Sequence, residues 1–279
     1  MDPRTSSRPN QAKFWCEPAF AGAELLKATY RTHCFPPHAH DEFAFGVIER
    51  GAQAWLDGRG RRVIMPEGTI CVINPHTLHE GRPATEVGWD YRMIYLPVTG
   101  LTSLLAEESE DVGTTLHFPQ PVIDDPQTLK LLRDAHVSSE LRDATQLEKT
   151  SRLTAAVFQL VRRHGQVSHP MRSAAPSLPG AVKRAREYID AHVAANPSLD
   201  IIAQAAGMSS FHLLRAFKKA VGVAPHAYLV QRRVETARHL LLKGQSLRHV
   251  AIAVGYCDQG HLSREFSRFF GVPPGVARR

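Results

Sequence analysis

Long apolar runs, cysteine pairs and an apolar first segment are the features that this sequence lacks. No stretch of its 279 residues approaches the roughly 18 consecutive apolar residues that cross a membrane, which excludes an integral membrane protein. Segment 1–10 is polar and has no apolar core behind its arginines, so we expect no secretory signal. The four cysteines lie far apart without a CxxC pair, which argues against disulfides and cysteine zinc sites and indicates a cytoplasmic protein.

The chain does have a globular composition and an uneven distribution of charge. Hydrophobic residues make up 43% and charged residues 22%, and at roughly 150 residues per domain the length predicts about two domains. Basic side chains outnumber acidic ones by 34 to 27, and the whole surplus lies in residues 178–279, which hold 15 basic and 6 acidic groups. This asymmetry favours a polyanion-binding module joined to a near-neutral domain, although a solvated basic surface would give the same count.

The sequence changes its apolar pattern twice along the chain. Short apolar runs separated by turn residues fill residues 24–96 and predict an all-β sandwich or barrel. From about residue 127 the spacing becomes helical. Segment 166–178 is rich in proline, serine and alanine without an apolar period, which predicts a linker. We therefore expect an α+β protein of two domains, a β-barrel followed by helices in residues 1–165 and an all-helical domain in residues 179–279.

The basic third contains a diverged internal repeat. An Ala-xxx-Gly motif at Ala203 and Gly207 recurs 48 positions later at Ala251 and Gly255, and each copy is followed by a Leu-x-Arg-x-Phe pattern. The small alanine lets two helices approach closely and the glycine supplies a left-handed turn, so each copy predicts a helix-turn-helix unit. A helix over residues 224–243 is predicted to connect the two units.

Each unit is predicted to expose one helix to a nucleic acid. The leucine and the phenylalanine of each repeat lie four residues apart and face the core, which leaves polar and basic groups on the outward side. Arginine pairs well with guanine and glutamine with adenine in the major groove, so double-stranded DNA is the expected partner. A rigid connection would place the two recognition helices about 34 Å apart, in successive grooves. A helical domain that only packs is the alternative, which the duplication and the charge disfavour.

Over about residues 178–279 the repeat resembles the AraC/XylS family of bacterial transcriptional regulators. The second unit matches the family pattern at eleven positions of fixed spacing, which are Ala251, Gly255, Tyr256, Asp258, His261, Leu262, Arg264, Phe266, Phe270, Gly271 and Pro274. The resemblance implies a set of DNA-contacting residues, which are Ser209, Ser210, Phe211, Leu214, Arg215, Lys218, Lys219, Gln259, His261, Ser263, Arg264 and Arg268.

Two positions depart from the family pattern. Ala277 stands where the family usually has an aromatic residue, so the last short helix is expected to be less firmly docked. Leu214 stands where many relatives have a polar group, so we expect hydrogen-bonded readout mainly from the second unit.

Two histidine segments flank predicted strands of the first domain. His38 and His40 precede an apolar run, and His79 follows another. This layout resembles the cupin-type (jelly-roll) β-barrel sensor domains at the front of many AraC-family regulators, over about residues 14–97. Barrel mouths bind small molecules with apolar walls and a few polar groups, and the candidate ligand-binding residues are His38, His40, Glu42, Phe45, Trp55, His79 and Tyr91. For any one of them an ordinary core or loop role is the alternative.

A metal centre is the competing interpretation of these histidines. His38, His40 and His79 could supply three imidazole ligands to iron, manganese or zinc. Catalytic cupins add a carboxylate about four residues after the second histidine, where Ala44 and Phe45 stand here. We therefore expect no cofactor and no enzymatic activity, and the alternative is a metal-dependent cupin enzyme with a basic nucleic-acid-binding tail.

Together these patterns predict a transcriptional activator whose DNA binding is controlled by a small-molecule effector in the barrel. The resemblance further implies RNA polymerase as a partner and a homodimer formed through the helices of residues 127–164. A ligand-independent architectural DNA binder is a third possibility, which would show little sequence preference.

Overall fold

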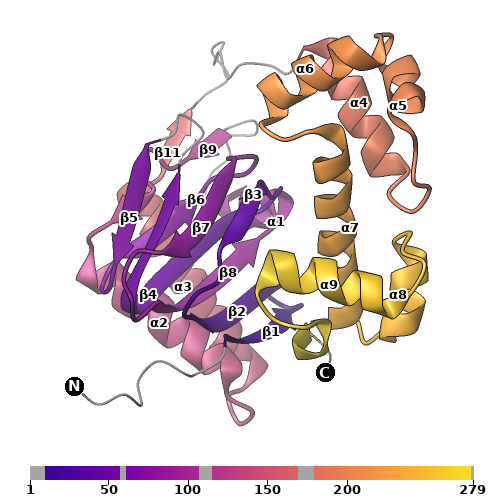
Figure 1. Cartoon of the computed structure of the whole chain (residues 1–279). Coiled ribbons are helices and arrows are strands. Elements are labelled where there is room, and N and C mark those ends of the chain that lie inside the picture. The colour runs from indigo at the N-terminus through magenta and orange to yellow at the C-terminus, as the bar shows by residue number, and fades with distance from the viewer. Residues whose placement is uncertain (1–9, 57–60, 107–114, 169–178, 278–279) are drawn as a thin grey trace. The chain divides into compact units, whose positions relative to one another are not determined.

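The computed structural model describes residues 10–56, 61–106, 115–168 and 179–277, and the chain forms two compact units (Figure 1). The first unit is mainly a cupin-like sheet domain with trailing helices, and the second contains the described helices from Gly180 onward together with Phe35–His38 and Leu78–Glu80. The order of a sheet domain and a helical domain confirms the expected fold class. No described helix combines the length and the apolar composition that a membrane crossing requires. The predicted linker begins as a short strand, β11 (Gln166–Ser168), and its residues 169–178 lie outside the described part of the chain.

Antiparallel strands build the first unit. Their bounds are β1 (Gln11–Glu17), β2 (Ala23–Tyr30), β3 (Phe35–His38), β4 (Phe43–Leu56), β5 (Arg62–Pro66), β6 (Ile70–Ile73), β7 (His79–Pro83), β8 (Trp89–Leu96), β9 (Thr115–His117) and β10 (Val122–Ile123). The main sheet runs in the order β1-β2-β8-β4-β6-β10, while β5 and β7 pair with the second half of β4 and β3 pairs with β7. Strand β11 pairs with β9 in a separate ribbon.

The long strand β4 changes partners at a bulge. Its first half pairs with β6 and β8, and the register shifts between Ile48 and Arg50. Gly51 follows with a φ of 73°, and a Cβ there would lie 2.0 Å from the carbonyl oxygen of Gly88. Only glycine allows this approach, which lets the second half of β4 pair with β5 and β7.

The unit also has three helices, α1 (Val98–Ala106) between β8 and β9, and α2 (Pro126–Glu140) and α3 (Gln146–His164) after β10. Helix α2 begins with Pro126 in its first turn and with Asp125 as a cap that accepts the Thr128 N–H. Helix α3 begins at Thr145, whose hydroxyl accepts the N–H of Glu148. The expected trailing helices are therefore present, and they cover one face of the main sheet (Figure 1).

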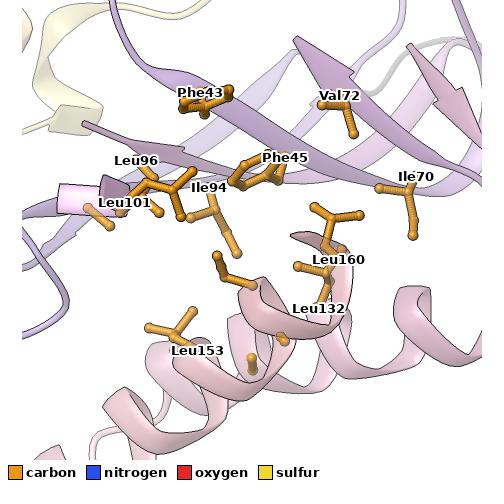
Figure 2. Packing of buried hydrophobic residues seen from close by; sticks show 14 of the residues in the cluster. Phe43, Phe45, Ile70, Val72, Ile94, Leu96, Leu101, Leu132, Leu153 and Leu160 are labelled. Carbon is orange, nitrogen blue, oxygen red and sulfur yellow. The ribbon is translucent and has the colours of Figure 1, made fainter. Parts of the chain in front are cut away.

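Alternation along the strands decides which side chains meet these helices. Phe43, Phe45 and Val47 of β4 point to the covered face and belong to one cluster with Leu132 and Leu160 of the helices (Figure 2). Phe45 is 1% exposed. Its side chain fills the core between sheet and helices, and a contact of Phe45 with a ligand stays a prediction.

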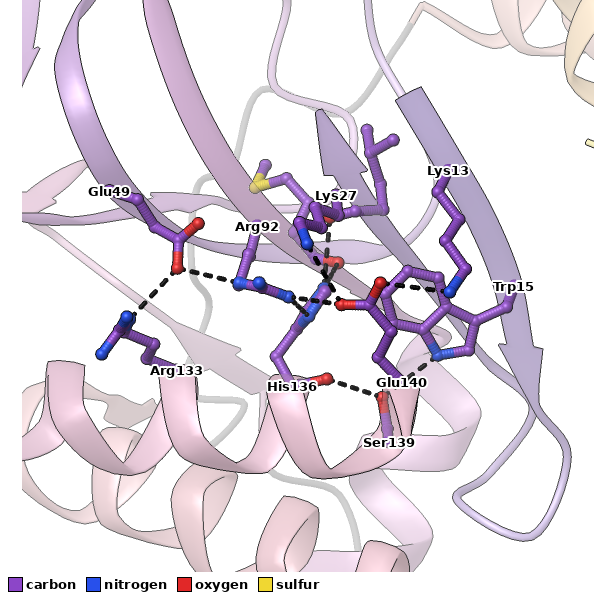
Figure 3. A network of polar contacts seen from close by, with 11 residues as sticks. Lys13, Trp15, Lys27, Glu49, Arg92, Arg133, His136, Ser139 and Glu140 are labelled. Carbon is purple, nitrogen blue, oxygen red and sulfur yellow. Dashed lines mark hydrogen bonds and ion pairs between the residues drawn. The ribbon is translucent and has the colours of Figure 1, made fainter. Parts of the chain in front are cut away.

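A buried polar network fastens α2 to the same face of the sheet (Figure 3). The Arg92 guanidinium on β8 donates to Glu49 at 2.8 Å, and to His136 and Glu140 of α2 at 3.1 Å each. Glu140 also accepts from Lys13 at 3.1 Å. Burial alone would raise the pKa of Glu140, but the hydrogen bonds from Lys13 and Arg92 outweigh it and lower the pKa to about 2. The ion pairs are therefore complete at neutral pH.

His136 must be neutral in this network. Its Nδ1 accepts from Arg92, so its Nε2–H donates to the carbonyl oxygens of Leu26 and Met93 at 3.1 and 3.2 Å. Burial lowers the pKa of His136 to about 3, and the Arg92 charge adds to the effect. Protonation would put a second donor against the guanidinium, so the folded state excludes the charged ring.

Phe45→Ala should lower the free energy of unfolding of the sheet domain by about 3–5 kcal/mol, because it leaves a cavity in the core. All three tryptophans, Trp15, Trp55 and Trp89, belong to this domain, so urea unfolding followed by tryptophan fluorescence measures it directly. Ile64→Ala, at a side chain that is half exposed on β5, is the control and should cost far less. A loss at Phe45 below about 1 kcal/mol would contradict its place in the core.

Acid should destabilise the sheet domain through His136. The unfolded ring binds a proton below its ordinary pKa of 6.5 and the folded ring only near 3, so stability is lost as the pH falls between these values. Between about pH 7.5 and pH 5 the loss from this residue is about 2 kcal/mol. His136→Gln should flatten the pH dependence of the unfolding free energy, while His117→Gln, at an exposed histidine on β9, should not. Equal slopes in both variants would refute the buried neutral ring.

Candidate nucleic-acid interface and ligand site

The first helix-turn-helix unit consists of α5 (Leu199–Ala206) and α6 (Ser210–Val221). Gly207 ends α5 in the left-handed conformation with a φ of 68°. Ser209 then caps α6, since its hydroxyl accepts the His212 N–H. The predicted left-handed turn is confirmed, and together with the Ser209 cap it fixes the angle at which α6 leaves α5.

The second unit, α8 (Leu247–Ala253) and α9 (Gln259–Phe270), repeats this design. Gly255 has a φ of 85°, and Asp258 caps α9 by accepting the His261 N–H at 2.8 Å. This hydrogen bond holds the pKa of Asp258 below its ordinary value, so the cap is a carboxylate. A negative cap suits the positive end of the helix.

Helix α7 (Pro225–Leu242) joins the two units, with Pro225 in its first turn as expected. Tyr228 and Leu229 of α7 pack into the first core with Leu213 and Phe217, beside α4 (Gly180–Ala191). Toward its other end α7 contacts α8 and α9. The helix therefore packs against both units, and α6 and α9 lie near its opposite ends (Figure 1).

Arg233 in the middle of α7 contacts the connection between α4 and α5 and the turn of the second unit. It is 5% exposed, donates from Nε to the Val193 carbonyl at 2.8 Å after α4, and lies 5.5 Å from the ring centroid of Tyr256 after α8. Sequence analysis did not single out Arg233, because nothing in the repeat marks a bridge between its copies. At the end of the chain, Ala277 is buried in the 3-10 helix η2 (Pro274–Ala277) despite replacing an aromatic residue.

The predicted DNA contacts lie on the outward sides of α6 and α9. The exposed ones are Ser209, Phe211, Leu214, Arg215, Lys218, Lys219, Gln259, His261, Arg264 and Arg268, and the half-buried ones are Ser210 and Ser263. The Ser210 hydroxyl hydrogen-bonds the Asp200 carboxylate. The buried side of each helix carries the leucine and phenylalanine of the repeat, as expected. The structure thus gives both helices one packed side and one free to meet a ligand.

A shallow hollow of about 550 Å³ lies along α6. Arg215, Lys218 and Lys219 stand around an apolar floor of Met208 and Ala216. Three cations around such a hollow suit an anionic group such as a phosphate. The three cations were predicted to contact DNA. The apolar lining by Met208 and Ala216 was not predicted, because the repeat pattern does not show that Met208 lies beside α6.

The histidine segments of the sheet domain lie partly together. His38 on β3 and His79 on β7 have ring centroids 4.2 Å apart, and the His40 ring meets Tyr95 edge-on at 5.7 Å. The Nδ1–H of His38 donates to the Pro36 carbonyl at 2.8 Å, and that of His40 does the same to a backbone carbonyl. Within the described ranges, no three His, Cys, Asp or Glu side chains are grouped to hold a metal ion.

The other predicted ligand residues separate into different environments. Tyr91 points away from the helix-covered face and packs on Tyr30 at 5.9 Å and Trp89 at 6.1 Å. Trp55 is buried near the end of β4, and Glu42 is half-buried before its start. Tyr30 was missed although its place on β2, opposite Trp89, follows from strand alternation once the pairing is known.

Hydrogen bonds of backbone groups and of the Asn74 side chain connect the histidine segments to β9, which pairs with β11. The His76 N–H donates to the His40 carbonyl at 2.8 Å, which joins the two segments. Two residues earlier, the Asn74 amide donates to the Phe118 carbonyl at 2.8 Å and accepts the Phe118 N–H at 2.9 Å. Phe118 directly follows β9, which pairs with β11. A displacement of the histidine segments therefore has a short bonded route to β11.

Comparison with known families and proteins agrees with this arrangement. Residues 20–160 match an AraC-like ligand binding domain, and residues 202–279 match a helix-turn-helix domain. The transcriptional regulator YbfI of Bacillus subtilis is 29% identical over 82% of this chain and 81% of its own length. The transcriptional activator RhaS of Salmonella schwarzengrund is 24% identical over 88% of each chain.

Solved structures share the fold at low identity. A crystal structure of apo ToxT from Vibrio cholerae aligns over 95% of this chain and 94% of its own, with a TM-score of 0.58 and 10% identity. ToxT bound to (E)-4-(8-methylnaphthalen-1-yl)but-3-enoic acid aligns with a TM-score of 0.56 and 9% identity. At such identities the likeness concerns the fold alone.

The two turn glycines should respond differently to substitution. Gly207→Ala should cost about 1–2 kcal/mol, because alanine resists the left-handed conformation and its Cβ would meet only the end of the Arg184 side chain. Gly255→Ala should cost clearly more, because its Cβ would also lie 2.6 Å from the Ala194 carbonyl oxygen. Thermal unfolding followed by far-ultraviolet circular dichroism measures both. Equal losses would contradict the close backbone approach at Gly255.

Proposed function

The chain belongs to the AraC family of transcriptional regulators, and we propose that a small-molecule effector bound by its N-terminal domain controls how its C-terminal domain binds specific duplex DNA. The observation that carries the proposal is the pair of capped recognition helices, which expose Arg215 and Arg264 at matched positions of the repeat. The two helices are held by one connecting helix, as a reader of two successive major grooves requires.

In this proposal one set of side chains contacts the base edges and another set binds the phosphates. Arg264, Gln259, His261 and Ser263 bring hydrogen-bonding groups to the outward side of α9, where base edges would lie. Lys218, Lys219 and Arg268 lie further along the two helices and are suited to phosphates. The basic surplus of residues 178–279 adds a sequence-independent attraction to any duplex.

The effector site is assigned to the face of the sheet opposite the helices. Its supports are the family match over residues 20–160, the closeness of the His38 and His79 rings, and the packing of Tyr91 against Tyr30. ToxT, a fold relative, binds a small carboxylic acid, which makes an organic effector a reasonable class for this chain. An effector that favours one conformation of the histidine segments would shift the population competent for DNA binding, with Asn74 and β9 as the route to β11.

Partners other than DNA follow from the relatives and from exposed apolar groups. RhaS is a transcriptional activator, which supports activation, and hence RNA polymerase as a partner of this chain. Leu131, Leu141 and Leu147 on and beside α2 and α3 are exposed, Leu147 by 77%, which favours a homodimer contact through these helices. The relatives are regulators and not enzymes, and we assign this chain no catalysis and a place in the cytoplasm with the DNA.

Selection from a random duplex library by the purified chain, at about 50 and 200 mM salt, tests the proposal, because salt weakens phosphate attraction more than base readout. The proposal predicts a motif with two boxes, each the short sequence that one helix-turn-helix unit recognises, about one helical turn apart. Recovery of no motif at either salt, with or without added cell metabolites, would refute sequence-specific binding.

Arg264→Ala should weaken binding to the selected site by about 1–3 kcal/mol and relax the base preference at one position. Lys219→Ala, at an exposed lysine of α6, is the matched control and should weaken binding to all sequences while lowering the salt slope by about 1. Titrations on the selected site and on point-mutated sites measure both. A uniform loss for Arg264→Ala would instead make Arg264 a phosphate contact.

A further inference from the structure

The two recognition helices differ in one respect that the repeat makes visible. Aligned at Leu213 and Leu262, they carry the same arginine at Arg215 and Arg264. At two neighbouring outward positions α6 has Phe211 and Leu214, while α9 has Gly260 and Ser263. One copy is therefore apolar where the other is small or polar.

These apolar side chains are not part of the core. Phe211 is 64% exposed and Leu214 is 40% exposed, whereas Leu213 between them is fully buried. The guanidinium of Arg215, one helical turn after Phe211, lies 5.6 Å from the centroid of its ring. The cation and the ring thus form one outward surface, a pairing of a hydrogen-bond donor with an apolar group.

In the major groove only one base presents an apolar group. Thymine carries a 5-methyl group beside its O4 acceptor, and phenylalanine is among the side chains that contact it. Arginine bonds the O6 and N7 of guanine. Because the Arg215 guanidinium lies 5.6 Å from the Phe211 ring, we expect the two side chains to contact neighbouring base pairs.

We infer that α6 reads a thymine methyl group through Phe211, with Leu214 at its edge, next to a guanine read by Arg215. The first unit then recognises its box by apolar contact and the second by hydrogen bonds. The inference rests on the proposed DNA binding and adds the chemistry by which the first box is recognised. It also explains why Phe211 and Leu214 are exposed beside the basic side chains of this helix.

Removal of the methyl group alone tests the inference. In the selected site, each thymine of the first box is replaced in turn by deoxyuridine, which keeps the base pair and its hydrogen-bonding edge. At one position the full-length chain should lose about fourfold in affinity, the equivalent of one buried methyl group. Phe211→Ala should bind the thymine and deoxyuridine duplexes equally, so that the discrimination vanishes in the double-mutant cycle.

Control variants separate the methyl contact from other effects. Ile252→Ala removes another exposed apolar side chain, 65% exposed on α8, and should leave the discrimination intact. Arg215→Ala should lower the affinity for the selected site and relax the preference for guanine at the neighbouring base pair, while the preference for thymine remains. Replacing the contacted T·A pair by 5-methylcytosine·G should bind more tightly than replacing it by unmethylated C·G.

Each outcome distinguishes this inference from the proposed function. A site that is selected but whose deoxyuridine substitutions affect the wild-type chain and Phe211→Ala equally would overturn methyl reading and leave DNA binding standing. Phe211 would then belong to a protein-binding surface. A chain that selects no site would overturn both.

Discussion

The C-terminal unit depends on α7 as a rigid body shared by two helix-turn-helix units. Its first half supplies Tyr228 and Leu229 to one core, and the helix also contacts α8 and α9. Arg233 donates to the Val193 carbonyl after α4 and lies over the Tyr256 ring after α8. At 1.5 Å per residue, its 18 residues span about 27 Å. A connection of this length and stiffness fixes the separation of the recognition helices before any DNA is bound, so no ordering of a linker opposes binding.

In the sheet domain a buried polar network fixes the position of α2 on the sheet, as α7 fixes the positions of the recognition helices. A buried arginine, a neutral histidine and two carboxylates hold α2 against the sheet, where a purely apolar contact would permit several registers. The helices occupy one face of the sheet, and we propose the opposite face and the histidine segments as the place of an effector. The bonded route through Asn74 and Phe118 then leads from these segments to β11, the last described strand before residue 179.

The helix-turn-helix units could be predicted because their determinants are local. A left-handed glycine, a capping side chain and a leucine–phenylalanine pair act within about 15 residues of each other, and each has a strong residue preference. The placement of Phe45 could not be predicted in the same way. Strand alternation shows which residues share a face but not which face a later helix will cover, and α2 and α3 lie about 80 residues or more further along the chain. Strand β11 could not be predicted either, because it pairs with β9, which lies about 50 residues earlier in the chain.

A change in the spacing of the two boxes tests most directly whether α7 holds the two recognition helices at a fixed separation. In the selected site, one box is moved away from the other by about 5 bp or about 10 bp, and affinity is measured by titration with the full chain. A rigid α7 predicts that both insertions reduce binding to the level of a single box, since the first turns the box to the other face of the duplex and the second moves it beyond reach. Undiminished affinity after either insertion would contradict the account.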